Sequence, residues 1–291
     1  FNPSILDNWI AADTSVSPGK SMQVVLGYEE YIKNMYKIQV EGYYKDLKNL
    51  LTYEEKRSTT DAQVSDESLA NIVTPADGYA YGLELFGQKM SGKLSGWVAY
   101  TYSVSRKIMN SIYADGEQEY YTNWDRTHAF SVLGNYQFNK KWETNWRFAL
   151  QSGQAYTPIM GYYVQKFPES PEELFRTIPG TRNSGRYEPY SRLDIGAVYH
   201  AKIGKTNVDF FFQIINTLNR SNTFRKIYSL GSPYNGLDDD GDWDKDLHDT
   251  NGNGRADPGE TNVDESDEGK INERSIGLFP ILPTFGFTWE F

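Results

Sequence analysis

Apolar and polar residues alternate one by one along much of this chain. In residues 283–291 the aromatic residues Phe285, Phe287, Trp289 and Phe291 occupy every second position, and the residues between them are polar or glycine. Side chains of a β-strand point alternately to its two faces, so this segment is predicted to be a strand with one apolar and one polar face. The same alternation recurs upstream and predicts an all-β protein.

Nine antiparallel strands are predicted, at roughly residues 21–32, 36–45, 79–88, 94–105, 130–138, 142–151, 192–200, 208–214 and 275–291. Tight turns containing Gly, Asn or Lys alternate with long polar connections. In bacterial outer-membrane barrels the short turns are periplasmic and the long loops extracellular. On that pattern the chain ends with Phe291 at the periplasmic side.

Two-sided strands of this kind favour an antiparallel transmembrane β-barrel, whose wall has lipid outside and water or protein inside. A soluble β-sandwich or jelly roll is the alternative, because its strands also alternate. Aromatic residues near the strand ends and the regular short-long rhythm of the connections favour the barrel. Since bacterial barrels generally have an even number of strands, nine are not expected to close by themselves. Further strands of the same parent protein, or of a second chain, are expected.

Composition agrees with a barrel. The 291 residues are 15% aromatic, contain no Cys and have a mean hydropathy of −0.64. A spanning helix needs about 18 consecutive apolar residues and no run approaches that length, whereas a spanning strand needs only about 9–11 residues. The lack of Cys excludes disulfides and thiolate metal sites. The sequence opens at Phe1 without a signal peptide, and we expect the chain to be truncated there.

Several stretches, in this order, resemble the C-terminal part of a TonB-dependent outer-membrane receptor: residues 25–29, 43–45, 80–85, 96–103, 124–128, 192–196, 216–219 and the terminal Phe291. The resemblance implies a barrel of about 22 strands, of which these would be the last nine, around an N-terminal plug domain. Residues 1–291 would then be part of a single barrel domain, and the plug and the TonB-contacting segment are absent from this sequence. The terminal Phe resembles the signal read by the barrel-assembly machinery.

The resemblance implies the cell outer membrane of a Gram-negative bacterium and active import of a scarce solute. Iron chelates, cobalamin, glycans and peptides are all substrates of the family. The implied partners are TonB through the missing N-terminal region, the plug or remaining barrel strands, outer-membrane lipid and, at the extracellular side, a lid lipoprotein, whose presence stays open. A passive porin or adhesin-type barrel without energy coupling is the alternative. No nucleic-acid partner is expected.

Enzymatic chemistry has little support in the sequence. Asp125 and His128 would be the acid-base pair of an outer-membrane hydrolase, but no Ser or Cys nucleophile is marked beside them. A polar cluster at a strand end is the preferred interpretation. The three histidines follow no metal-binding spacing. We therefore expect no enzyme and no catalytic residues.

The connection at residues 155–186 is rich in aromatic residues. Tyr156, Tyr162, Tyr163 and Phe167 are candidate ligand-binding residues, since aromatic rings stack on a sugar or on a planar chelate. This chemistry does not decide among the substrates.

A long acidic loop is predicted at residues 229–274, on the extracellular side. Residues 238–268 contain 13 acidic and two basic residues, a net charge of −11, against −10 for the whole chain. The rest of the chain therefore carries about +1, and the sequence pI near 4.9 describes one loop.

Within this loop, residues 249–260 match the calcium loop of an EF-hand position by position. The expected ligands are Asp249, Asn251, Asn253, Arg255 through its carbonyl, Asp257 and Glu260. Gly254 permits the sharp turn. Upstream, Asp238, Asp240 and Asp242 alternate likewise and would hold a second ion. The expected cofactor is a structural Ca²⁺; a solvated acidic loop without an ion is the alternative.

Overall fold

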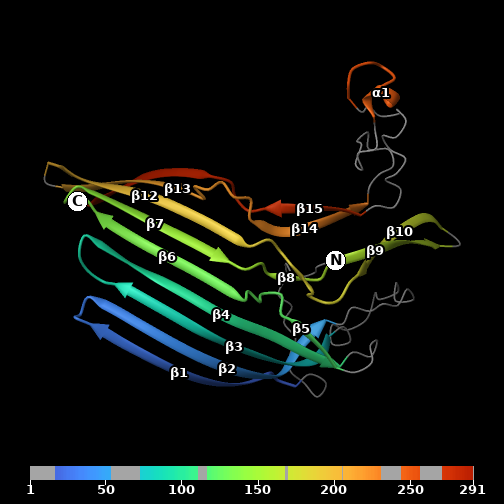
Figure 1. The fold of residues 1–291 in the computed structure, drawn as a ribbon, viewed down its shortest axis with the longest axis horizontal. Helices are drawn as coiled ribbons and strands as arrows, with labels where there is room; N and C mark the ends of the chain where they lie inside the picture. The colour runs from blue at the N-terminus through green and yellow to red at the C-terminus, as the bar shows by residue number, and fades with distance from the viewer. Residues whose placement is uncertain are drawn as a thin grey trace. The chain divides into compact units, whose positions relative to one another are not determined.

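A computed structural model describes residues 17–53, 73–110, 117–167, 170–204, 206–230, 244–255 and 271–290. Its main element is one antiparallel sheet (Figure 1). In spatial order the sheet consists of β1 (Lys20–Ile32), β2 (Tyr36–Tyr53), β3 (Val73–Lys89), β4 (Leu94–Asn110), β6 (His128–Gln137), β7 (Trp142–Gln151), β12 (Tyr190–Ile203), β13 (Thr206–Ile215) and β16 (Leu282–Glu290). These nine strands confirm the predicted all-β, antiparallel architecture. A short strand, β5 (Glu117–Tyr121), extends the pairing of β4.

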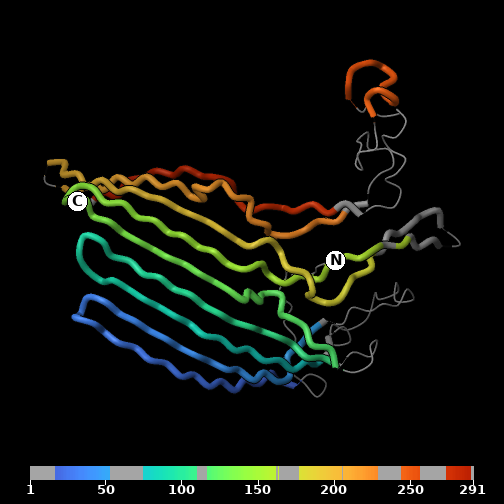
Figure 2. Tube along the Cα trace, viewed as in Figure 1, coloured from blue at the N-terminus to red at the C-terminus, as the bar shows by residue number. Residues whose placement is uncertain are grey.

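The short turns lie together at one end of the sheet, at the left of Figure 2. Between β1 and β2, Lys33 and Asn34 have φ of 52° and 50°, and the Met35 amide donates to the Ile32 carbonyl at 3.0 Å. Two central residues with positive φ are typical of the tight hairpin turns that match strand twist. Glu290, the last described residue, pairs with Asn207 beside the β12–β13 turn. The chain thus ends at the short-turn end of the sheet, as predicted; Phe291 itself lies outside the described residues.

The sheet presents large apolar side chains to the exterior on one face. Leu26 on β1 is 81% exposed, and Phe285 and Phe287 on β16 are 86% and 61% exposed. On the other face of β16, the aromatic ring of Phe211 lies over Gly286, within 2.4 Å of where a Cβ would stand. In a soluble protein the apolar face of a sheet is buried, because its exposure to water is unfavourable. This sheet instead leaves its apolar face exposed.

Within the described residues, the buried hydrophobic cluster is small and lies where β5 pairs with β4. Ala76, Met109 and Tyr120 form a buried cluster, with Leu50 packed against it. The hydroxyls of Thr52 and Tyr120 lie 2.9 Å apart and satisfy each other. This end of the sheet, where the long connections leave, is the part that packs as a soluble protein does.

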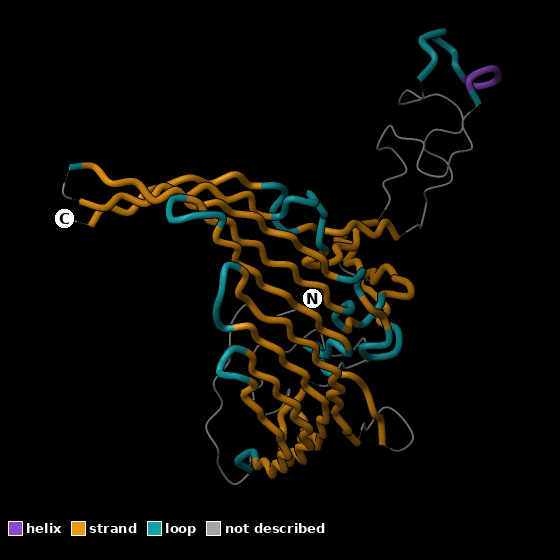
Figure 3. Tube along the Cα trace, turned by 60° about the vertical axis from the view of Figure 1, so that its left-hand side comes forward, coloured by secondary structure: helices purple, strands orange, loops and turns teal. Residues whose placement is uncertain are grey.

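The long connections contain structure that the alternation did not predict. The described residues fall into two compact units. The sheet unit includes a short ladder of β8 (Ala155–Tyr156) with β11 (Gly185–Arg186). The other unit contains two hairpins and one helix: β9 (Ile159–Phe167) with β10 (Ser170–Pro179), β14 (Thr223–Leu230) with β15 (Ile271–Gly277), and α1 (Lys245–His248). Figure 3 shows α1 as a purple coil. In the part of the chain that the structure describes, no helix is long and apolar enough to cross a membrane.

The last sheet strand begins later than predicted. A start near Ser275 was expected, but residues 271–277 pair with β14, and β16 begins at Leu282. Pro280 falls in the break between the two strands. Within the described residues, β1 pairs only with β2 and β16 only with β13, so the sheet is open between these two strands.

Candidate functional site

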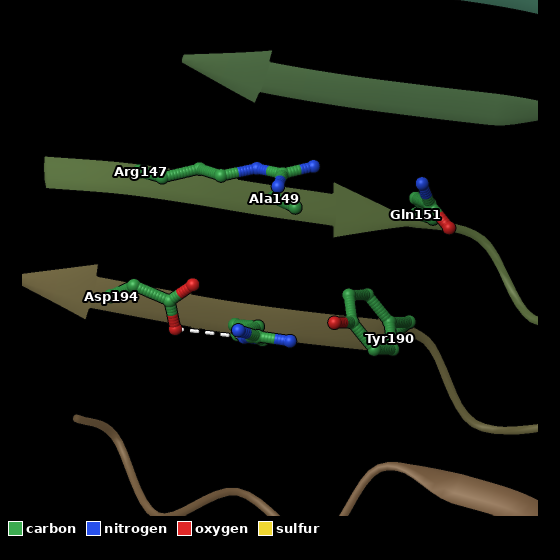
Figure 4. A pocket seen from close by; sticks show the side chains of 6 residues that line it. Arg147, Ala149, Gln151, Tyr190 and Asp194 are labelled. Atoms are coloured by element: carbon green, nitrogen blue, oxygen red, sulfur yellow. Dashed lines mark hydrogen bonds and ion pairs between the residues drawn. The ribbon is translucent and has the colours of Figure 1, made fainter. Parts of the chain in front are cut away.

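A polar pocket of about 200 Å³ lies between β7 and β12, near the end of the sheet that carries the long connections. Arg147 on β7 is paired in register with Asp194 on β12, and Arg192 pairs with Ala149 (Figure 4). Gln151 and Tyr190 complete the lining. All six side chains lie on the face predicted to be polar, because they alternate with the apolar residues of both strands.

The pocket has one more positive than negative charge. Arg192 Nε donates to Asp194 Oδ1 at 2.7 Å, so these two charges neutralise each other. Arg147, whose guanidinium lies over the β7 strand in Figure 4, forms no ion pair with a described carboxylate, although its charge acts on that of Asp194. A guanidinium presents a planar fork of donors that matches a carboxylate or a phosphate. The pocket can therefore receive one anionic group.

Asp194 is held by a buried asparagine. Asn216, 2% exposed, donates its backbone N–H to Asp194 Oδ1 at 2.9 Å. Its side-chain amide donates to the carbonyls of Arg220 and Phe279 at 3.1 and 3.0 Å. Asn216 therefore ties the end of β13 both to the pocket and to the segment before β16, and its φ of 53° suits an asparagine. Residues 216–219 were recognised in the sequence only as a resemblance; the structure explains them as an anchor.

A second buried network surrounds Asp125, which is 3% exposed. Its carboxylate accepts from the Ser105 amide at 2.7 Å and from Arg186 Nη2 at 2.6 Å. Arg186 also donates to the carbonyls of Asp125 and Gly153 at 2.9 and 3.2 Å. Next to this bond the backbone of Tyr187 packs against Gly153, where a Cβ would meet the Tyr187 carbonyl oxygen at 1.6 Å. The Asp125 network thus fixes both ends of the connection between β7 and β12 to the corner before β6.

This corner stacks cations on aromatic rings. The guanidinium groups of Arg106 and Arg186 lie 4.1 and 4.4 Å from the ring centroid of Tyr121. Arg182 lies 4.6 Å from the ring of Tyr120. Arg106 and Arg186 also form ion pairs, with Glu119 at 3.1 Å and with Asp125 at 2.6 Å, whereas Arg182 forms none with a described carboxylate.

Lys107 adds a cation that no carboxylate neutralises among the described residues. It lies on the last part of β4, which pairs with β5 beyond the β4–β6 ladder. Its ammonium donates to the Leu51 carbonyl at 3.1 Å and lies 5.8 Å from the Trp124 ring. Burial and the nearby Arg182 charge lower the pKa of Lys107. An anion bound here would relieve the repulsion between the two cations.

The structure does not bring together Asp125 and His128, the acid-base pair that was considered as the alternative. The structure gives Asp125 the partners described above, whereas His128 Nδ1 lies 2.9 Å from the Tyr100 hydroxyl and its ring packs on Tyr102 at 5.5 Å. Asp125 is a polar strand-end group, as the preferred interpretation held.

The predicted aromatic ligand residues are divided between the two units. Tyr156 on β8 stacks on Tyr187, with ring centroids 4.6 Å apart and planes 4° from parallel. Tyr162, Tyr163 and Phe167 lie on β9 of the hairpin unit. The side chains of Tyr162 and Phe167 lie outside the described residues.

Part of the predicted calcium loop is described. Asp249 accepts from the amides of Gly252 and Gly254 at 2.6 and 2.7 Å, and Asn251 and Asn253 accept from amides two residues ahead at 3.0 and 2.8 Å. Gly254 has the positive φ, 74°, that the pattern requires. Among the described residues no three His, Cys, Asp or Glu side chains form a metal-binding group. Five of the predicted ligands lie outside the described residues: Asp257, Glu260, Asp238, Asp240 and Asp242.

Sequence reasoning missed several residues that build the corner. Asn183, 4% exposed with a φ of 50°, donates to the Tyr121 carbonyl at 2.5 Å and to Asn123 Oδ1 at 2.6 Å. Asn222, also 4% exposed, forms a pair of hydrogen bonds with the backbone of Ser191 at 2.8 and 3.0 Å. Both lie in irregular segments, where alternation carries no signal. The Gly, Pro and Ser residues near them in sequence indicate turns, but they do not indicate which backbone groups the two asparagines bind.

No family model matches the sequence, and no curated protein matches it. Among solved structures, the chain is similar to the FrpB iron transporter from Neisseria meningitidis (F3-3 variant), with 16% sequence identity and a TM-score of 0.44. The match covers 72% of this chain and 28% of that one, so this chain spans less than a third of the transporter's length.

Proposed function

We propose that this chain forms part of the wall of a plugged outer-membrane β-barrel receptor that imports a scarce solute with energy relayed by TonB. The observation that carries the proposal is the two-sidedness of the nine-stranded sheet. One face exposes large apolar side chains, and the other carries ion pairs and arginines. A wall between lipid and a polar lumen requires this distribution.

The polar face supports a solute with an anionic group. Arg147, Lys107 and Arg182 form no ion pair with a described carboxylate, and all three lie toward the end where the long connections leave. A pocket of about 200 Å³ is smaller than the ~300–1,000 Å³ that whole small molecules occupy. It therefore suits one carboxylate or phosphate of a larger solute, or an acidic side chain of a plug. Within the sheet unit, stacking by Tyr156 would add contacts to a planar or sugar-like part. A ligand role for Tyr162, Tyr163 and Phe167 stays a separate prediction for the hairpin unit.

A nutrient-competition experiment tests the proposal. Cells lacking this protein are grown against the parent strain, with iron chelates, cobalamin, glycans or peptides as the limiting nutrient in turn. We expect a growth defect on one class, which deletion of tonB reproduces. A defect that tonB deletion does not reproduce would instead support a passive porin. If the deletion strain grew as well as the parent strain on all four nutrient classes, the result would contradict the import function.

We further propose that residues 249–260 bind Ca²⁺ in the acidic loop. The support is the EF-hand spacing together with the positive φ of Gly252 and Gly254, which bring Asp249, Asn251 and Asn253 into one tight turn. Extracellular sites of this kind have Kd values of about 10⁻⁴–10⁻³ M.

Calorimetric titration with CaCl₂ tests the calcium site. We expect Asp249→Ala to abolish the heat of binding, because the first ligand of the loop is lost. Asp267→Ala removes one charge from the same acidic segment but lies outside the pattern, and should leave binding intact. An equal loss of the heat of Ca²⁺ binding in both variants would mean that the acidic loop attracts Ca²⁺ nonspecifically, without the predicted site.

A further inference from the structure

Three glycines leave a gap in the apolar face of the sheet, close to the short turns. Lys89, Gly96, Gly134 and Trp146 form one row across four neighbouring strands, β3, β4, β6 and β7. In the adjacent row, Gly87 pairs with Val98. Paired residues share a face of the sheet, so the three glycines lack side chains on the same apolar face.

The gap is a groove of about 420 Å³. Besides the glycines it is lined by apolar side chains from β4, β6, β7 and the β1–β2 hairpin, among them Ile32, Ile38, Leu94, Val98, Val132 and Trp146. The Trp146 indole forms one wall, because a Cβ on Gly134 would stand 2.1 Å from a ring atom. Gly96 has a φ of 150°, which a side chain would strain. The groove is therefore built into the sheet by backbone geometry as well as by sequence.

A cation stands at the groove. Lys89 lines it, and its ammonium lies near the Gly92 turn, 3.8 Å from where a Cβ on Gly92 would be. No carboxylate forms an ion pair with Lys89 among the residues that the structure describes. Lys37, which also lines the groove, is already paired with Glu29 at 2.8 Å. Lys89 therefore supplies the unneutralised charge of this site.

We propose that the groove binds one acyl chain of an anionic phospholipid, with the lipid phosphate at Lys89. An apolar groove on the lipid-facing side is filled most favourably by hydrocarbon, since water there would gain no hydrogen-bond partners. The lysine at the turn end favours an anionic headgroup by charge complementarity. The inference rests on the proposed membrane location, because it takes the apolar face to be in contact with lipid.

Native mass spectrometry of the full protein, extracted from its own membrane in mild detergent, tests the inference. The protein is offered phosphatidylglycerol and phosphatidylethanolamine in equal amounts. Gly87→Leu fills the groove without a clash, since the nearest atom to a Cβ there is 3.5 Å away. Gly42→Leu is the matched control: it lies on the same face, outside the groove, with the nearest atom 3.9 Å away.

We expect the unaltered protein and Gly42→Leu to retain one phosphatidylglycerol, and Gly87→Leu to lose it. Lys89→Gln should lower the preference for phosphatidylglycerol by about fivefold, the effect of one cation near a charged headgroup. Equal retention by Gly87→Leu overturns the inference, as does a second protein chain held in place of lipid.

Carbonate extraction separates this inference from the proposed function. If the protein stays in the membrane but binds lipid equally well with Gly87→Leu, the result contradicts the lipid groove and leaves the proposed function intact. A protein released from the membrane by carbonate contradicts both proposals.

Discussion

At the scale of single residues, one buried carboxylate holds the long-connection end of the sheet together. Asp125 is 3% exposed and is compensated by Arg186, the Ser105 amide and, at 3.5 Å, the Thr127 hydroxyl. A buried charge is tolerated only when it is paired and hydrogen-bonded. Asp125 therefore stabilises the corner as long as Arg186, from a segment 61 residues away, stays in place.

Replacing Asp125 by Ala is expected to lower the free energy of unfolding by about 3–5 kcal/mol, because Arg186 loses its counter-charge. Urea titration of the protein in detergent micelles, followed by tryptophan fluorescence, measures this change. Thr127→Ala, which removes only the long hydrogen bond, should lower it by at most about 1 kcal/mol. Equal effects of the two substitutions would contradict the role assigned to the ion pair.

The residues of this corner were only partly predictable. Asp125 was singled out in the sequence because it lies in the family-like stretch 124–128 and was interpreted as part of a polar cluster at a strand end. Arg186 and Asn183 were not, since their partners are backbone and side-chain groups brought near by the β8–β11 ladder. Alternation predicts which face a side chain occupies, but it contains no information on contacts between loops.

At the scale of elements, the apolar face of each strand determines what surrounds the sheet. The rings of Phe210 on β13 and Phe287 on β16 lie 6.3 Å apart on the exposed face, while Gln213 and Thr284 pair on the opposite face. Neighbouring strands thus agree in phase, as a continuous wall requires.

Phe287→Arg is expected to cost about 2–4 kcal/mol of unfolding free energy if this face contacts the bilayer midplane. Guanidinium titration of the protein refolded into lipid vesicles measures it. Gln213→Arg places the same charge on the polar face of the neighbouring strand and should change stability by about 0.5 kcal/mol or less. Tolerance of Arg at Phe287 would contradict the lipid-facing assignment.

All nine sheet strands were predictable from the sequence because each is long and alternates over most of its length, although consecutive apolar residues interrupt the alternation in β1 and β13. The hairpins β9–β10 and β14–β15 were not, since they lie within polar connections that were interpreted as loops. The late start of β16 was missed because residues just before it also form a strand. These residues, 271–277, pair with β14 and not with β13. Alternation identifies a strand without identifying its partner.

At the scale of the whole molecule, the short turns and the long connections lie at opposite ends of the sheet (Figure 2). In the proposed barrel these ends face the periplasm and the exterior. The chain contains no Cys, so a single introduced thiol reports its own accessibility. Ser184 near the long-connection end and Lys140 in a short turn are both exposed and suit this purpose.

In intact cells, Ser184→Cys should react with a maleimide attached to a polyethylene glycol too large to cross the outer membrane. Lys140→Cys should react only after the cells are permeabilised. The shift in gel mobility measures both reactions. The reverse pattern would invert the orientation, and labelling of both thiols in intact cells would contradict a membrane-spanning sheet.

The free side of β1 determines what kind of strand can join it. All 13 residues of β1 are exposed, and within the described residues only its β2 side is paired. In hydrocarbon, unpaired backbone groups along such an edge are strongly unfavourable, so a further strand is needed there. Directly opposed residues share a face, so that strand must place its apolar side chains opposite Met22, Val24 and Leu26. A neighbouring strand paired one residue out of this register would turn its polar side chains to the lipid, so only every second register is compatible with β1.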